Sequence, residues 1–272
     1  VAGCSHSPVS GGAPPAYDSA RSQYSEARQA GRVESGEITE SSGLAASRCQ
    51  DKVLWTHNDS DGGPFLFAID ETGRDLGVWR VTNAENLDWE DIAAYRDGDG
   101  KCFVYIGDIG NRRKEPRTEH KIYRVAEPKV SAGGGTSRNE AAATEPAEVM
   151  SFYYPDGPRD AETLMVHPAG ADIYVVSKIR DAAAGVYKLR PAFGNPPVRA
   201  ERVSDLTVPA IPNGFLTAGD IAPDGKRLVI SDYFAAYEFL LPAEAKGFDE
   251  IWKQKPAVID LGDRDQGEAV CY

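Results

Sequence analysis

Short hydrophobic strands recur along the chain, each group beginning with the same pattern. A small or acidic residue precedes an aliphatic residue, and two or three short residues then lead into a turn. The aliphatic positions are Leu44, Ile92, Leu164, Ile221 and Val270, separated by 48, 72, 57 and 49 residues. Periods of about 40–50 residues with four strands each are typical of propeller blades. The pattern predicts an all-β fold, a β-propeller of four-stranded blades.

Three further strands follow the first strand in four of these repeats, and aromatic and β-branched residues dominate them. The second strands are expected at 53–57, 102–107, 173–177 and 227–231, the third at 65–69, 121–125, 185–189 and 236–240, and the fourth at 77–81, 149–153, 202–206 and 257–261. The long second period contains a low-complexity insertion, 126–147, with three consecutive glycines and three consecutive alanines.

The repeats amount to four complete blades and the first strand of a fifth. Residues 31–38 precede the first repeat and suit the outermost strand of the last blade, which would close the ring. The propeller domain is therefore expected at 31–272, with five blades preferred, six as the alternative, and the last blade incomplete. We expect the natural chain to continue beyond Tyr272.

The charge balance argues against nucleic acid as a partner. The chain has 272 residues, with 30 Lys and Arg against 42 Asp and Glu, and a net charge of −12. Binding to phosphates needs a basic surface, which this composition does not supply. No apolar run reaches the roughly 18–20 residues of a membrane span.

The first residues, Val1-Ala2-Gly3-Cys4, resemble the lipobox of bacterial lipoproteins. The resemblance implies a signal-peptide remnant, lipidation at Cys4 and a flexible tether through residue 30. The alternative is a chance cysteine near the start of the sequence. The expected location is extracytoplasmic, in the periplasm or on the cell surface, with the protein bound to the membrane through the lipid.

The remaining cysteines fit an exported protein with few disulfides. Cys49 and Cys102 fall in equivalent turns of neighbouring blades, on the same face of the disc. This placement predicts a disulfide between them, and two unrelated buried thiols are the alternative. Cys271 is left without a partner.

Acidic residues are expected to converge at one mouth of the axial channel, because the first strand of each blade begins on that face and the second ends there. Mutual repulsion raises the pKa of such carboxylates unless a cation lies among them, and oxygen ligands without a His or Cys cluster suit Ca²⁺. The alternative is that each residue caps a strand or turn. The first strands contribute Glu90, Asp91, Asp160, Glu162, Asp220 and Glu268. The candidate ligand-binding residues are Asn58, Asp59, Arg112, Arg113, Lys178 and Asp232.

Several short segments resemble those of a group of exported bacterial β-propeller lipoproteins of poorly defined function. These segments are 42–45, 54–59, 88–92, 105–111 and 266–269. That group is distantly similar to the calcium-dependent β-propeller phytases and the esterase-like propeller domains. The phytases use carboxylates, bridging Ca²⁺ and basic side chains against phosphate. The resemblance implies metal-binding roles for Glu90, Asp108, Glu162, Asp220 and Glu268.

The sequence favours a binding module: a lipid-anchored extracytoplasmic propeller that binds a small molecule or a protein at its acidic face, with calcium as the candidate cofactor. The alternative is a calcium-dependent hydrolase of phosphoesters or lactones, with glycoside hydrolysis ranked lower. The chain has no Gly-x-Ser-x-Gly elbow, and its four His residues are scattered. Whether it is an enzyme stays open at this stage.

Overall fold

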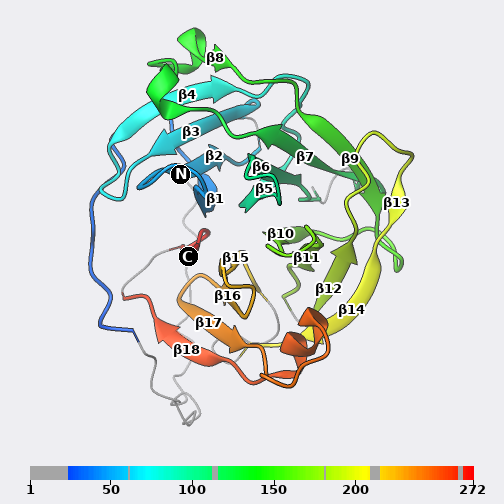
Figure 1. Ribbon diagram of the computed structural model, residues 1–272. Coiled ribbons are helices and arrows are strands. Elements are labelled where there is room, and N and C mark those ends of the chain that lie inside the picture. The colour runs from blue at the N-terminus through cyan, green and yellow to red at the C-terminus, as the bar shows by residue number, and fades with distance from the viewer. Residues whose placement is uncertain (1–23, 61, 112–115, 181, 209–214, 263–265) are drawn as a thin grey trace, which may run out of the picture.

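The computed structural model describes residues 24–60, 62–111, 116–180, 182–208, 215–262 and 266–272. These residues form four largely antiparallel sheets arranged around an axis (Figure 1). Each sheet has its first strand in chain order on the inside and successive strands further out, as the repeat predicts. The protein is a β-propeller, and among the described residues no helix is long and apolar enough to cross a membrane.

The first two blades each carry a fifth, two-residue strand at their outer edge. Blade one consists of β1 (Ser41–Ala46), β2 (Leu54–Asn58), β3 (Phe65–Ile69), β4 (Asp75–Arg80) and the parallel β8 (Ala142–Ala143). Blade two consists of β5 (Trp89–Arg96), β6 (Cys102–Asp108), β7 (His120–Ala126), β9 (Glu148–Tyr153) and the parallel β13 (Val198–Arg199).

The last two blades have four strands each. Blade three consists of β10 (Ala161–Val166), β11 (Ile173–Ser177), β12 (Ala184–Leu189) and β14 (Glu201–Leu206). Blade four consists of β15 (Ala218–Ile221), β16 (Arg227–Ser231), β17 (Ala235–Leu240) and β18 (Ala257–Asp260). Three short 3₁₀ helices, η1 (Val130–Ala132), η2 (Arg138–Glu140) and η3 (Phe248–Lys253), lie in the connections.

The insertion 126–147 is more than a surface loop, because it joins the sheet of the neighbouring blade. Ala142 pairs with Trp79 and Ala143 with Arg80, and Gly135 bridges to Val78. The insertion therefore covers the outer edge of blade one, which would otherwise offer unpaired backbone groups to solvent.

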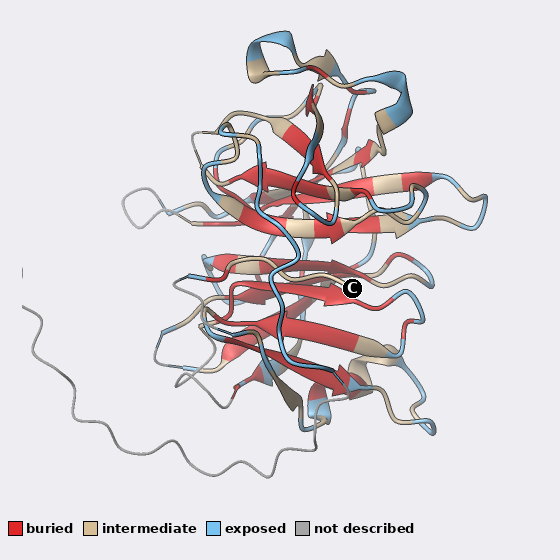
Figure 2. Cartoon of the chain, turned by 90° about the vertical axis from the view of Figure 1, so that its left-hand side faces the viewer, coloured by how far each residue is buried: buried red, intermediate tan, exposed pale blue. Residues whose placement is uncertain are grey.

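Three hydrophobic clusters hold neighbouring blades together, between blades one and two, two and three, and three and four. Large rings dominate them, and Trp55, Tyr105 and Tyr237 are fully buried in the three clusters respectively. Figure 2 shows the buried strands stacked inside and the exposed residues concentrated in the connections. Burial of these apolar surfaces supplies most of the stability of such a ring.

The junction between blades four and one is polar instead. Arg48 forms an ion pair of 3.1 Å with Asp220, and Asp220 also accepts a hydrogen bond from the backbone N–H of Tyr272 at 3.0 Å. The C-terminal end lies between β1 and β15, near the axis (Figure 1). Residues 266–272 thus reach the inner position that the fifth repeat predicts, although they form no strand.

The expected count of five or six blades is not confirmed, since the described residues form four. The segment 31–38 also forms no strand. Instead, the N–H groups of Arg32 and Glu34 donate to the carbonyls of Thr72 and Gly73, in the turn between β3 and β4. The partner strands that would complete a fifth sheet between blades four and one are not among the described residues.

The predicted disulfide is confirmed: Cys49 and Cys102 are bonded across blades one and two. Cys49 lies in the turn between β1 and β2, and Cys102 begins β6, so the bond fastens the face opposite the mouth. Cys271 is a free thiol, and burial raises its pKa to about 12.

Candidate functional site

Two groups of carboxylates meet where the inner strands begin. The first group is Asp59, Asp88 and Glu90, and the second is Glu90, Asp160 and Glu162. Within each group one oxygen of every residue lies within 4.8 Å of the others. We call these five residues the acidic mouth. Glu90 belongs to both groups and therefore joins blades one, two and three.

β-Bulges aim two of these side chains. The pairing of β5 with β6 shifts register between Trp89 and Asp91, and that of β10 with β11 shifts between Ala161 and Thr163. Glu90 and Glu162 are therefore the extra residues of equivalent bulges. A bulge interrupts the alternation of side chains and redirects the inserted one, which here brings both carboxylates to the same mouth.

Glu90 is the least satisfied member of the acidic mouth. Its exposed fraction is 7%, and within the described chain it forms no hydrogen bond and no ion pair. Burial raises its pKa well above the ordinary value, and the charges of Glu162, Asp59 and Asp88 raise it further. A buried carboxylate in this state is costly for the protein unless a cation or a proton compensates it.

The pKa values of the neighbouring carboxyl groups are raised for the same reason. Burial raises the pKa of Asp59 to about 6. Burial also raises the pKa of Glu162 to about 7, although Lys178 forms a 2.9 Å ion pair with it and opposes the shift. Charge repulsion among Glu90, Asp160 and Glu162 adds to the effect of burial.

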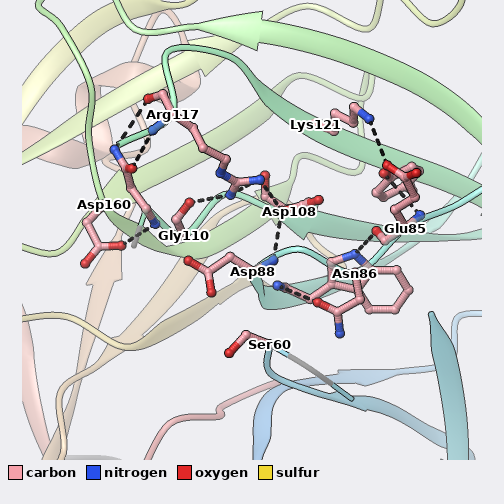
Figure 3. Close-up of polar contacts among 12 residues, drawn as sticks. Ser60, Glu85, Asn86, Asp88, Asp108, Gly110, Arg117, Lys121 and Asp160 are labelled. Atoms are coloured by element: carbon pink, nitrogen blue, oxygen red, sulfur yellow. Dashed lines mark hydrogen bonds and ion pairs between the residues drawn. The ribbon is translucent and has the colours of Figure 1, made fainter. Parts of the chain in front are cut away.

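Gly110 lets the backbone come close to the carboxylates. A Cβ atom at this position would collide with Glu90 Oε1 and Asp88 Oδ2. The Gly110 carbonyl accepts a hydrogen bond from the guanidinium of Arg117, which also pairs with Asp108 at 2.6 Å (Figure 3). Any larger residue at position 110 would displace the carboxylates that converge there.

Asp108 supports the mouth from behind. Its Oδ1 accepts from Arg117 and, at 3.1 Å, from the backbone N–H of Asp88, while its Oδ2 is buried without a hydrogen-bond partner in the described chain. Burial raises its pKa, and Arg117 opposes that shift. Asp108 therefore positions Asp88 and does not join either carboxylate group.

The structure separates Asp220 from the acidic mouth. Asp220 lies immediately before Ile221, as Asp91 lies before Ile92, and strand alternation turns both away from the direction of Glu90. Asp91 is fully buried and accepts hydrogen bonds from the N–H groups of Leu164 and Gly219. Both aspartates tie inner strands together.

The other predicted residues fall into three classes. Asn58 and Asp232 are engaged locally: Asn58 binds the backbone of residues 37, 39 and 40, and Asp232 accepts from Phe234, Ala235 and Tyr237. Glu268 is half-buried near the mouth, where its charge raises the pKa of Asp59 and Glu162. Arg112 and Arg113 lie outside the described residues.

Sequence reasoning placed Asp160 at the mouth but gave no role to Asp88. Asp88 stands two residues before Glu90, as Asp160 stands two residues before Glu162, and this shared Asp-x-Glu spacing is the signal that would have found it. The contacts of Arg117 with Asp108 and Gly110 were not predicted, because the connection between β6 and β7 is longer than the corresponding connections of the other blades and no repeat position marks Arg117.

We expect the metal-free protein to lose stability as the pH rises from 6.5 to 8. Folded carboxyls with raised pKa values retain protons that the unfolded chain has released, so stability falls as pH rises toward those values. His57 and His120, with pKa values lowered to about 4 and about 3 by burial, act in the opposite sense, but only below about pH 6.5.

One proton retained over 1.5 pH units corresponds to about 2 kcal/mol, or a fall of about 5 °C in melting temperature for a chain of this size. Scanning fluorimetry in the presence of a chelator measures this fall in melting temperature. With Ca²⁺ in place of the chelator, we expect the melting temperature to change less over the same pH range. A melting temperature that stays level or rises over this range would show that the mouth carboxylates have ordinary pKa values.

No family model matches the chain, and no curated protein matches it. Several solved structures are similar to the chain, two of them as follows. One is an auxiliary nutrient binding protein from Bacteroides ovatus, with 14% identity, a TM-score of 0.40 and coverage of 78% of this chain and 40% of that one. The other is the Dos1 propeller, with 10% identity, a TM-score of 0.33 and coverage of 82% and 59%. This chain thus spans less than two thirds of either structure, and no functional conclusion follows from these likenesses.

Proposed function

We propose that the acidic mouth binds a calcium ion and, through it, a small molecule or a partner protein. The observation that carries the proposal is Glu90, a buried carboxylate without a partner in the described chain, at the centre of four others. A divalent cation would remove the repulsion that raises the pKa values of these groups. The carboxylates then become ligands and need no protons.

The donor set favours Ca²⁺ over Mg²⁺ or Zn²⁺. The carboxylate groups offer oxygen atoms alone, without imidazole or thiolate, which disfavours zinc. Oxygen atoms spaced within 4.8 Å suit bonds of about 2.3–2.6 Å to one central ion. Bulged backbone and five carboxylates from three blades suit the flexible coordination of Ca²⁺ better than the strict octahedron of Mg²⁺.

Calorimetric titration of the metal-free protein tests this proposal. We expect one Ca²⁺ per chain, with Mg²⁺ binding more weakly, and a loss of binding in Asp59→Asn. Glu244→Gln is the matched control, because Glu244 is exposed and follows Leu240, at the end of β17 that lies away from the mouth. Equal heats of titration for the wild type and Asp59→Asn would contradict the proposal.

A calcium-dependent hydrolase is the second candidate, and Glu162 is the observation that favours it. A carboxyl with a pKa of about 7 can accept or donate a proton near neutral pH. Beside a bound cation, such a group could activate water against a phosphoester or a lactone. Turnover of these substrates that needs Ca²⁺ and disappears in Glu162→Gln would establish the hydrolase. Binding of these substrates without turnover would support the binding function instead.

An extracytoplasmic location and a lipid anchor at Cys4 complete the proposal. The disulfide between Cys49 and Cys102 supports the location, because such bonds persist in oxidising compartments. Cys4 lies outside the described residues, so the anchor rests on the lipobox resemblance. Mass spectrometry of the protein from a bacterial membrane fraction would detect the acyl chains, and an unmodified Cys4 would contradict the anchor.

A further inference from the structure

Three aromatic rings lie in contact at the edge of the acidic mouth, above blades three and four. The centre of the Phe215 ring lies 5.2 Å from that of Tyr233, with an angle of 66° between the ring planes, and the centre of the Tyr233 ring lies 6.4 Å from that of Phe234, with an angle of 85°. We call Phe215, Tyr233 and Phe234 the aromatic corner. Phe234 is 54% exposed, more than any other large hydrophobic side chain of the described residues.

The loop between β16 and β17 holds the aromatic corner in place. Asp232 Oδ1 accepts hydrogen bonds from the backbone N–H groups of Phe234 and Ala235, each at 2.8 Å, and Oδ2 accepts from the hydroxyl of Tyr237 at 2.6 Å. Asp232 is itself fully buried. The position of Phe234 is therefore fixed by a turn with several hydrogen bonds.

Lys178 connects the aromatic corner to the acidic mouth. Its ammonium group pairs with Glu162 at 2.9 Å and donates to the hydroxyl of Tyr233 at 3.1 Å. It also lies over the rings of Phe215 and Tyr233. The C-terminal segment also contacts the aromatic corner. The backbone N–H of Gly267 donates to the Tyr233 carbonyl, which places Glu268 next to the aromatic corner.

The surface thus places apolar ring faces next to hydrogen-bond acceptors and a hydrogen-bond donor. Glu162 and Glu268 supply carboxylate oxygens, and Lys178 supplies N–H groups. A purely apolar ligand would cover the remaining hydrogen-bonding capacity of Glu162, Glu268 and Lys178 without using it. A cationic ligand would meet Lys178 and Arg180, which already lie over the ring of Phe215.

We propose that the aromatic corner binds a neutral sugar residue of an oligosaccharide. The apolar C–H face of the sugar ring would pack on the exposed ring of Phe234, and its hydroxyl groups would donate to Glu162 and Glu268 and accept from Lys178. A site with aromatic walls and a few convergent polar groups is typical of small-ligand recognition. This inference rests on the proposed function, because it names the class of ligand that binds beside the calcium ion.

Titration with a panel of neutral oligosaccharides built from glucose, galactose, mannose and N-acetylglucosamine, in the presence of Ca²⁺, tests the inference. We expect at least one to bind with a dissociation constant below about 1 mM, and Phe234→Ala to weaken it about fivefold to tenfold. Leu240→Ala is the matched control, because Leu240 is 49% exposed at the far end of β17. It is expected to bind like the wild type.

The two proposals can fail separately. Phe234→Ala should keep the calcium affinity of the wild type, since Phe234 contributes no oxygen ligand. Calcium binding without any oligosaccharide binding, or sugar binding that Phe234→Ala leaves unchanged, would overturn the inference alone. Choline binding in place of every sugar would also overturn it, in favour of a cationic ligand. Absence of calcium binding would overturn the proposed function.

Discussion

Replacing Glu90 with Gln is expected to abolish the rise in melting temperature that Ca²⁺ causes in the wild type. Glu90 is shared by both carboxylate groups, so its loss breaks each of them. A ligand present at about 100 times its dissociation constant stabilises the folded protein by about 2.7 kcal/mol. The variant should lose this stabilisation almost entirely.

The same substitution should have the opposite effect without metal. At pH 8 in a chelator, the wild type must either hold a proton on Glu90 that the unfolded chain releases or bear a buried charge among four carboxylates, and Gln does neither while preserving the shape of the side chain. Glu90→Gln should therefore melt at a higher temperature than the wild type, as measured by calorimetry, with Glu244→Gln unchanged. A variant that is less stable in chelator and still responds to Ca²⁺ would show that Glu90 has only a structural role.

Removal of the disulfide is expected to cost about 4 kcal/mol of stability. The bond joins residues 53 positions apart, and closing a loop of that length restricts the unfolded chain by roughly this amount. Cys102→Ser should therefore lower the melting temperature by about 10 °C under oxidising conditions. Denaturant unfolding of the variant and of the wild type measures the difference directly.

Reduction of the wild type with dithiothreitol should reproduce the effect, and reductant should not change Cys102→Ser further. Cys271→Ser serves as the control, since Cys271 is a free thiol and removing it closes no loop. If Cys102→Ser unfolds at the same denaturant concentration as the wild type, the bond does not stabilise this propeller.

The strands could be predicted closely because each is short and rich in β-branched or aromatic residues. The expected ranges 173–177 and 227–231 are those of β11 and β16. The two short outer strands could not be predicted. Ala142–Ala143 and Val198–Arg199 pair in parallel with strands far away in the sequence, and two residues carry no periodicity that a pattern could reveal.

Convergence of Glu90 and Glu162 could be predicted from their equivalent positions, two residues before an aliphatic anchor. The bulges that aim them could not, since an extra residue in a ladder leaves no mark in composition. Asp220 was expected at the mouth and lies elsewhere for a different reason. It sits one residue before its anchor, as Asp91 does, so strand alternation turns it away from the direction of Glu90, and its side chain meets Arg48 at the junction of blades four and one.

A crystal structure of the protein grown with Ca²⁺, with anomalous scattering recorded, tests the central claim most directly. The account predicts one strong anomalous peak bounded by Glu90 and its neighbours Asp59, Asp88, Asp160 and Glu162, with oxygen atoms about 2.3–2.6 Å away. A mouth without a peak at saturating Ca²⁺, with the side chain of Glu90 unmoved and still without a partner, would contradict it.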